Sequence, residues 1–182
     1  IIVVDTTPPT GGSVVVHPEP TISWQEDCAT QFMACDGPRA HVQSSTSTLT
    51  ISWPDFTDSI SSISQFTWAA GSCEDNSNLL TGGVFQDAGV ASTVTAPVSL
   101  THGQTFCATV RVHNSVGHWS SWRSAPMFVD ATAPVAGWVN DGLTAGMDLD
   151  YQGIDTDIGA NWHSFFDAES GINSYRWAVG TT

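Results

Sequence analysis

The chain has 182 residues, 41% of them hydrophobic, which is enough for one or two compact domains with a buried core. Four Arg, no Lys and 18 acidic residues give a net charge of -14. This charge argues against nucleic-acid partners and anionic membrane surfaces, because basic faces bind both. No apolar run approaches the roughly 20 residues that span a bilayer, so we expect no membrane insertion in this segment.

Short runs of Val, Ile, Thr, Ser and Trp recur along the chain, separated by Gly, Pro, Asn and Asp. Ser and Thr together number 42, and no segment shows sustained helical periodicity. This pattern is typical of an all-β sandwich.

The first residues, IIVVD at 1–5, resemble MFVD at 127–130, and a turn of Thr, Ala and Pro follows each. We therefore expect residues 1–5 to be the last strand of a preceding repeat, and Asp5 and Asp130 to mark two unit junctions. Further strands are expected at residues 13–16, 48–53, 66–70 and 91–96, with a short edge strand at 84–85. Residues 17–47 are an insertion relative to the second unit.

Two stretches repeat without a gap: WPDFTDSISSISQFTWAAG at 53–71 and WHSFFDAESGINSYRWAVG at 162–180. Matched residues are always 109 positions apart. They are Trp53 and Trp162, Asp58 and Asp167, Ile63 and Ile172, Phe66 and Tyr175, Trp68 and Trp177, and Gly71 and Gly180. Such a match indicates a duplicated structural unit.

Residues 100–117 follow the pattern L-x-x-G-x-x-F-x-A-x-V-x-V-x-N-x-x-G. With TLTISW before it, this segment resembles the fibronectin type III family. The resemblance implies tandem β-sandwiches: a complete unit at 6–130 and the first half of another at 131–182. It also implies that Asn114 and Gly117 shape the turn after the sixth strand. The family has Tyr where this chain has Phe106, so one buried hydrogen bond is missing.

The second unit stops at Thr182, where the remaining strands of the fold would follow. Its aromatic face would then be uncovered. We expect a segment of a longer repetitive polypeptide, or a protomer that neighbouring copies complete.

Four cysteines allow three pairings. In the fibronectin type III fold, Cys73 and Cys107 fall at adjoining ends of neighbouring strands, so the resemblance implies that they pair. Cys28 and Cys35 would then close a small loop. Free thiols, or zinc bound by Cys28, Cys35 and His41, are the alternatives. Disulfides indicate an oxidising, extracellular setting.

The run HWSSWRS at 118–124 resembles the W-S-x-W-S box of cytokine-receptor modules, with Arg123 in place of the last Ser. We expect Arg111, Trp119, Trp122 and Arg123, with His113 nearby, to form a Trp/Arg ladder at a sheet edge. The ladder either stabilises the edge or contacts a ligand. The W-x-x-W spacing also resembles the acceptor motif for mannose attached to the first Trp, here Trp119.

The acidic run DLDYQGIDTD at 148–157 resembles an EF-hand loop, but a Gly stands where a bidentate Glu is needed. Calcium binding and a solvated loop are both open, and no other cofactor is expected. The candidate ligands are Asp141, Asp148, Asp150, Asp155 and Asp157.

Asp58 and Asp167, with Glu169, recur at one turn of each unit, where an Asp usually caps backbone donors. No catalytic motif is present, so we expect a non-enzyme. No N-x-S/T sequon occurs. Glycans are expected instead as O-linked sugars on Thr6, Thr7 or residues 44–48, or on modified Pro8 and Pro9.

Two functions fit these features. The first is a structural repeat of an extracellular filament or stalk, of the flagellar-hair or adhesion-fibre type, that assembles with copies of itself through exposed Trp24, Trp138 and the second unit. The second is a receptor or adhesion module that binds a protein or glycan through the 17–47 insertion and the Trp119–Trp122 edge.

Overall fold

The computed structural model describes residues 3–17, 41–75, 79–151, 153 and 156–180. These residues form two compact units, one extending to Ala131 and the other starting at Thr132. Trp24, Cys28, Cys35, Asp155 and Thr182 lie outside the described part, as do residues 18–40 of the 17–47 insertion. The predictions that depend on them are therefore untested.

The described residues are all-β: they contain strands, turns and no helix. Accordingly, no helix that could cross a membrane occurs among them. The strands of the first unit are β1 (Thr10–Gly11), β2 (Val15–His17), β3 (Val42–Gln43), β4 (Thr48–Ser52), β5 (Phe56–Thr57), β6 (Ile63–Gly71), β7 (Gln86–Gly89), β8 (Thr93–Pro97), β9 (Thr105–Asn114), β10 (Trp119–Arg123) and β11 (Met127–Val129). The second unit has β12 (Trp138–Asp141) and β13 (Ala160–His163).

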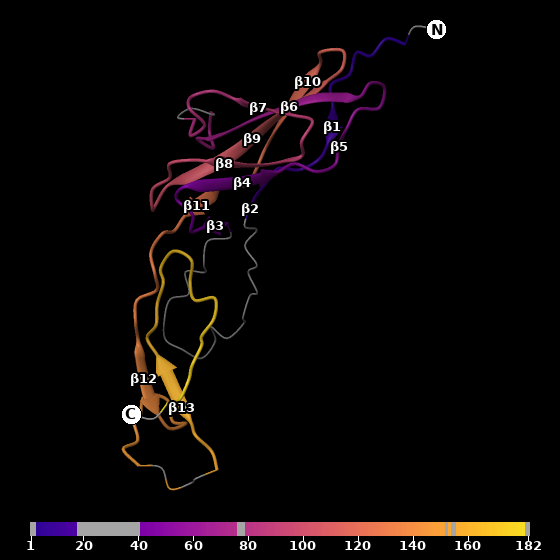
Figure 1. Ribbon diagram of the computed structural model, residues 1–182. Helices are drawn as coiled ribbons and strands as arrows, with labels where there is room; N and C mark the ends of the chain where they lie inside the picture. Colours follow the sequence, from indigo (N-terminus) through magenta and orange to yellow (C-terminus); the bar gives the residue numbers. More distant parts are fainter. Residues whose placement is uncertain (1–2, 18–40, 76–78, 152, 154–155, 181–182) are drawn as a thin grey trace. The chain divides into compact units, whose positions relative to one another are not determined.

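The first unit is a sandwich of two main sheets (Figure 1). One sheet has the order β2-β4-β8, and the other has the order β3-β11-β9-β6-β7, with β10 also paired to β9. Strands β6 and β9 run antiparallel, with Trp68 opposite Val110 and Phe66 opposite Val112. A short β1-β5 pair completes the unit.

The core of this sandwich comes from alternate residues of facing strands. Leu49 and Ile51 on β4 are fully buried, as the period-two pattern predicts. Trp53 follows them, and its indole N–H donates to the carbonyl of Ala91 at 2.9 Å. The Trp53 ring lies 5.9 Å from that of Phe66 on the opposite sheet. The aromatic residues of the first repeat therefore hold the two sheets together.

Four strand predictions differ from the structure, and the first is the strand expected at 1–5, of which the described residues 3–5 form no strand. The edge strand expected at 84–85 lies instead at β7. Phe85 precedes this strand, and its ring lies under the Arg111 guanidinium. Residues 13–16 begin later, as β2. The largest difference is in the second unit, where residues 172–180 form no strand although their repeat partner is β6. A strand needs a hydrogen-bonded neighbour, and β9 supplies it only in the first unit.

Cys73 and Cys107 form a disulfide, the pairing that the family resemblance implied. In the pairing of β9 with β6, Cys107 lies opposite Gly71, the last residue of β6. Cys73 follows Gly71 by two residues and so lies just beyond the paired strands. The bond closes a loop with a sequence separation of 34 residues.

Candidate functional site

A polar cluster with two buried members, Asp5 and Asn114, joins the entering chain to two loops of the first unit. We call Asp5, Thr7, Asp58, Ser61 and Asn114 the Asp5 cluster. One Asp5 oxygen accepts from the backbone and hydroxyl of Thr7, at 2.9 and 2.8 Å. The other accepts from the Ser61 hydroxyl at 2.6 Å and from Asn114 Nδ2 at 3.2 Å. The residue expected to mark a unit junction is thus fastened to the sandwich.

Asn114 is the centre of the cluster and is only 2% exposed. Its Nδ2 also donates to the Thr7 carbonyl and to Asp58 Oδ2, both at 3.1 Å. Its Oδ1 accepts from the backbone N–H of Val116 and of His118. One side chain therefore holds the β9–β10 turn and the entering segment in a fixed relation.

The turn itself needs Gly117, whose φ of 93° lies in the region that favours glycine. Its backbone N–H donates to the carbonyl of Asn114 at 3.2 Å. Asn114 and Gly117 thus shape the turn after β9, where the resemblance placed them.

Hydrogen bonds lower the pKa of both carboxylates in the cluster. Backbone donors from Ser61 and Ile60, helped by Asn114, lower the pKa of Asp58 from 3.8 to about 2. The Ser61 hydroxyl and the Thr7 backbone lower the pKa of Asp5. Each donor favours the charged form, so both side chains are carboxylates at neutral pH. Neither is suited to donate a proton as a general acid.

The Asp turn recurs in the second unit. Asp58 Oδ1 accepts from the backbone N–H of Ile60 at 3.0 Å and of Ser61 at 2.8 Å. Asp167 Oδ1 likewise accepts from the N–H of Glu169 at 3.2 Å and of Ser170 at 2.8 Å. The repeated Asp therefore caps backbone donors in both copies, as expected.

The Trp/Arg ladder is built differently from the prediction. The Arg111 guanidinium lies 3.8 Å from the centre of the Phe85 ring and 5.4 Å from that of Trp119. The Trp119 ring stacks on His113, with 6.2 Å between ring centres and 26° between planes. The structure thus brings together four side chains: Arg111, Phe85, Trp119 and His113. The sequence did not predict Phe85, because no local pattern at residues 84–85 indicates which side chain they contact.

Trp122 and Arg123 are not part of this stack. The Trp122 ring packs edge-on against Phe56 at 4.8 Å, on the core side of β10. Arg123 donates to the backbone carbonyls of Cys73 and Glu74, beside the disulfide. The strand alternates, so Trp119 and Trp122 face opposite sides of the sheet.

The acidic loop of the second unit is exposed at Asp141, Asp148, Asp150 and Asp157. Asp148 Oδ1 accepts from the backbone N–H of Asp141 at 2.9 Å, so one predicted calcium ligand is bonded within its own loop. Calcium binding here stays a prediction.

The predicted glycan sites differ in access. Thr6 and Pro8 are exposed, whereas Pro9 is buried. The Thr7 hydroxyl donates to Asp5, so a sugar at this atom would remove that hydrogen bond. Thr6 and Pro8 are therefore accessible positions at this junction, and Ser44, Ser47 and Thr48 are exposed as well.

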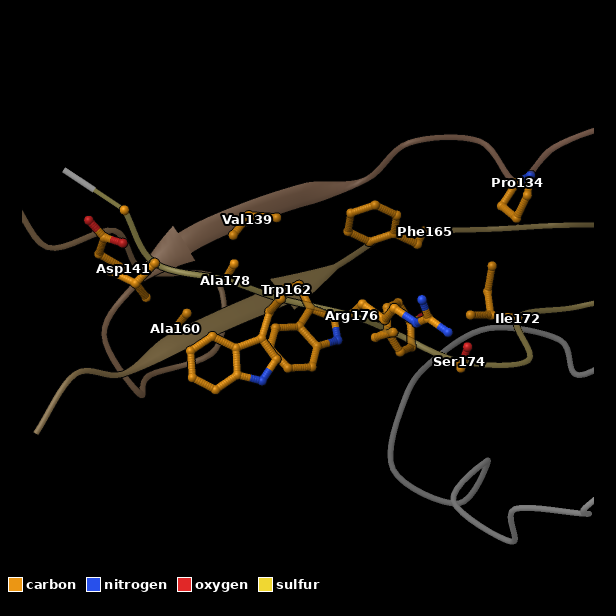
Figure 2. A pocket seen from close by; sticks show the side chains of 14 residues that line it. Pro134, Val139, Asp141, Ala160, Trp162, Phe165, Ile172, Ser174, Arg176 and Ala178 are labelled. Carbon is orange, nitrogen blue, oxygen red and sulfur yellow. The ribbon is translucent and has the colours of Figure 1, made fainter. Parts of the chain in front are cut away.

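The second unit presents an apolar concave face (Figure 2). The pocket on this face has a volume of about 700 Å³, and its lining includes Val139, Trp162, Phe165, Tyr175 and Trp177. The Tyr175 ring lies 5.6 Å from that of Trp162 and 5.8 Å from that of Phe165. These side chains form an aromatic cluster that is open to solvent.

The two copies of the repeat differ in how far their matched Trp side chains are exposed to solvent. Trp53 is 1% exposed and its partner Trp162 is 37% exposed. Trp68 is 3% exposed and its partner Trp177 is 64% exposed. The same sequence motif is therefore a core in the first unit and a surface in the second. Comparisons with protein-family models and with curated proteins give no match for this chain.

Proposed function

We propose that this chain is a non-catalytic structural repeat of an extracellular or cell-surface filament or stalk. Its units are fibronectin type III-like sandwiches that assemble with neighbouring copies. The observation that supports this most directly is the contrast between buried Trp68 and exposed Trp177. Large contiguous apolar surfaces are rare on isolated proteins, so we expect this face to be covered, either by further strands of the same polypeptide or by a neighbouring copy.

The Asp5 cluster supports a mechanical role. It binds the entering segment to two separate loops through hydrogen bonds, of which the one from Asn114 to Asp5 is buried. A segment held in this way is a stiffer connection than a free linker. Stiff junctions suit a rod built from repeats.

Two features support an extracellular location. The Cys73–Cys107 disulfide is of a kind that persists in oxidising compartments. Thr6 and Pro8 are also exposed beside the junction, where O-linked glycans would be accessible.

The assembly is tested by sedimentation velocity and negative-stain imaging of the purified chain at micromolar concentration. We expect associated or filamentous particles, and dissociation by Trp177→Ser, because this variant removes apolar surface from the contact. Val90→Ser is the matched control, since Val90 is 71% exposed but lies in the first unit. Dispersed monomers of the unsubstituted chain would contradict the proposal.

A receptor or adhesion module is the second candidate. The observation that favours it is the exposed stack of Trp119 with Arg111 and His113, because aromatic and guanidinium groups are frequent in binding surfaces. Titration of glycan and protein candidates with the Trp119→Ala variant tests it. Unchanged affinity in this variant would show that the sheet edge at Trp119 does not contact the ligand.

A further inference from the structure

We propose that Trp119 is a modification site that receives a mannose through a carbon–carbon bond to indole C2. The site is independent of the filament function. Among the eight Trp residues of the chain, Trp119 and Trp122 are the only pair with two residues between them. This W-x-x-W spacing is the one that tryptophan C-mannosyltransferases accept, and the first Trp is the acceptor.

The structure distinguishes the two indoles. Trp119 is 52% exposed on β10, and in the part of the chain that is described this strand pairs with no strand other than β9. Trp122 is half-buried and packs on Phe56. A bulky sugar can therefore be placed on Trp119 without opening the core, whereas on Trp122 it would displace Phe56.

The folded sandwich also presents Trp119 in a defined orientation. The β9–β10 turn before it is held by Asn114, and its ring is stacked on His113. The Arg111 guanidinium lies over the indole at 5.4 Å, in position to donate hydrogen bonds to sugar hydroxyls beside the ring. The stack thus offers polar partners to a sugar on one edge of the indole.

The transfer requires a polyprenyl-phosphate mannose as donor and needs no oxidant or reductant. The bond from mannose C1 to the phosphate oxygen breaks, and its electron pair stays on the phosphate. A bond forms between mannose C1 and indole C2, and the proton from C2 leaves to a base. Because Trp122 is packed in the finished sandwich, we place the transfer before folding, and the exposed Trp119 then accommodates the product.

Mass spectrometry of the secreted chain tests the site. The chain has no Lys, and cleavage after Arg111 and Arg123 releases residues 112–123 as one tryptic peptide. From cells that modify a reporter acceptor, we expect this peptide to carry one extra hexose. The hexose should survive fragmentation on Trp119, as a C-linked sugar does, and be absent when the transferase is deleted.

Two variants and one internal control sharpen the result. Trp119→Phe should remove the hexose completely. Trp138, which is 67% exposed but has Asp141 three residues later, should stay unmodified in every sample and serves as the internal control. Trp122→Ala should also abolish modification of Trp119, because the second Trp is part of the acceptor motif.

Since Trp122→Ala also removes packing, the same comparison is made on synthetic peptides of residues 112–123. They are incubated with microsomes and lipid-linked mannose, where folding plays no part. An unmodified peptide from transferase-positive cells would overturn the proposal. A hexose that maps to Ser115, Ser120 or Ser121 would overturn it as well.

Discussion

Asn114 connects more of the first unit than any other polar side chain described above. It accepts or donates in five hydrogen bonds that join the entering segment, the Asp58 turn and the β9–β10 turn. Two of its partners are carboxylates, and bonds to charged groups are the stronger ones. Loss of this side chain removes one donor from each of these acceptors and the acceptor of two backbone N–H groups in the β9–β10 turn.

We therefore expect Asn114→Ala to lower the free energy of unfolding by about 2–4 kcal/mol. Urea denaturation monitored by Trp fluorescence measures it. Ser115→Ala is the control, because Ser115 is the exposed next residue of the same turn. A loss for Asn114→Ala no larger than that of the control would show that solvent replaces the cluster readily.

Acid should weaken the same cluster. The pKa of Asp58 is about 2 in the folded chain against an ordinary value of 3.8, so its contribution to stability is present above pH 3.8. As the pH falls toward 2, the unfolded chain binds the proton first and the contribution is lost. Asp5, whose pKa is also lowered, adds to the effect with the same sign.

Carboxyl NMR titration should give the low pKa of Asp58 directly. Asp58→Asn should flatten the dependence of stability on pH between about 4 and 2. If this variant follows the curve of the unsubstituted chain, the charge of Asp58 does not stabilise the turn.

At the scale of the elements, the disulfide fastens β9 to the end of β6. A loop with a separation of 34 residues loses chain entropy worth roughly 3–4 kcal/mol when it is closed. We expect the Cys73→Ala, Cys107→Ala double variant to lose about this much stability and to keep its strands. Urea denaturation gives the loss, and far-ultraviolet circular dichroism reports whether the strands remain.

The two copies of the repeat should lose different amounts of stability when matched Trp residues are replaced by Ala. Trp68→Ala removes a buried ring from the core and should cost about 3–5 kcal/mol in unfolding free energy. Trp177→Ala removes an exposed ring and should cost less than about 1 kcal/mol. Equal costs, measured by denaturation at a protein concentration too low for association, would mean that the two copies have the same surroundings.

At the scale of the whole molecule, charge should oppose assembly. Each copy has a net charge of -14, so neighbouring copies repel unless salt screens them. We expect association, measured by sedimentation velocity, to strengthen as NaCl is raised. Weaker association at high salt would indicate that ion pairs, rather than the apolar face of the second unit, hold the copies together.

The sequence by itself determined the all-β class, the repeat and the buried face of β4, because these depend on local periodicity. Leu49, Ile51 and Trp53 alternate with polar residues whatever lies opposite them. The recurrent Asp turn was also readable, since Asp58 and Asp167 bond to donors two or three residues away. The Cys73–Cys107 pairing required the family resemblance in addition.

Only the tertiary structure decided which side chains meet across the fold. Asp5 and Asn114 are separated by 109 residues, and no local pattern joins them. Trp122 points away from Arg111, because alternate residues of β10 face opposite sides of the sheet, and the ring beside Arg111 is that of Phe85. Residues 172–180 and 63–71 share one motif, yet a strand forms only where a neighbouring strand supplies hydrogen-bond partners and covers the aromatic face. Which strand lies beside a given segment depends on how the sheets assemble, and the periodicity of the segment's own sequence does not predict it.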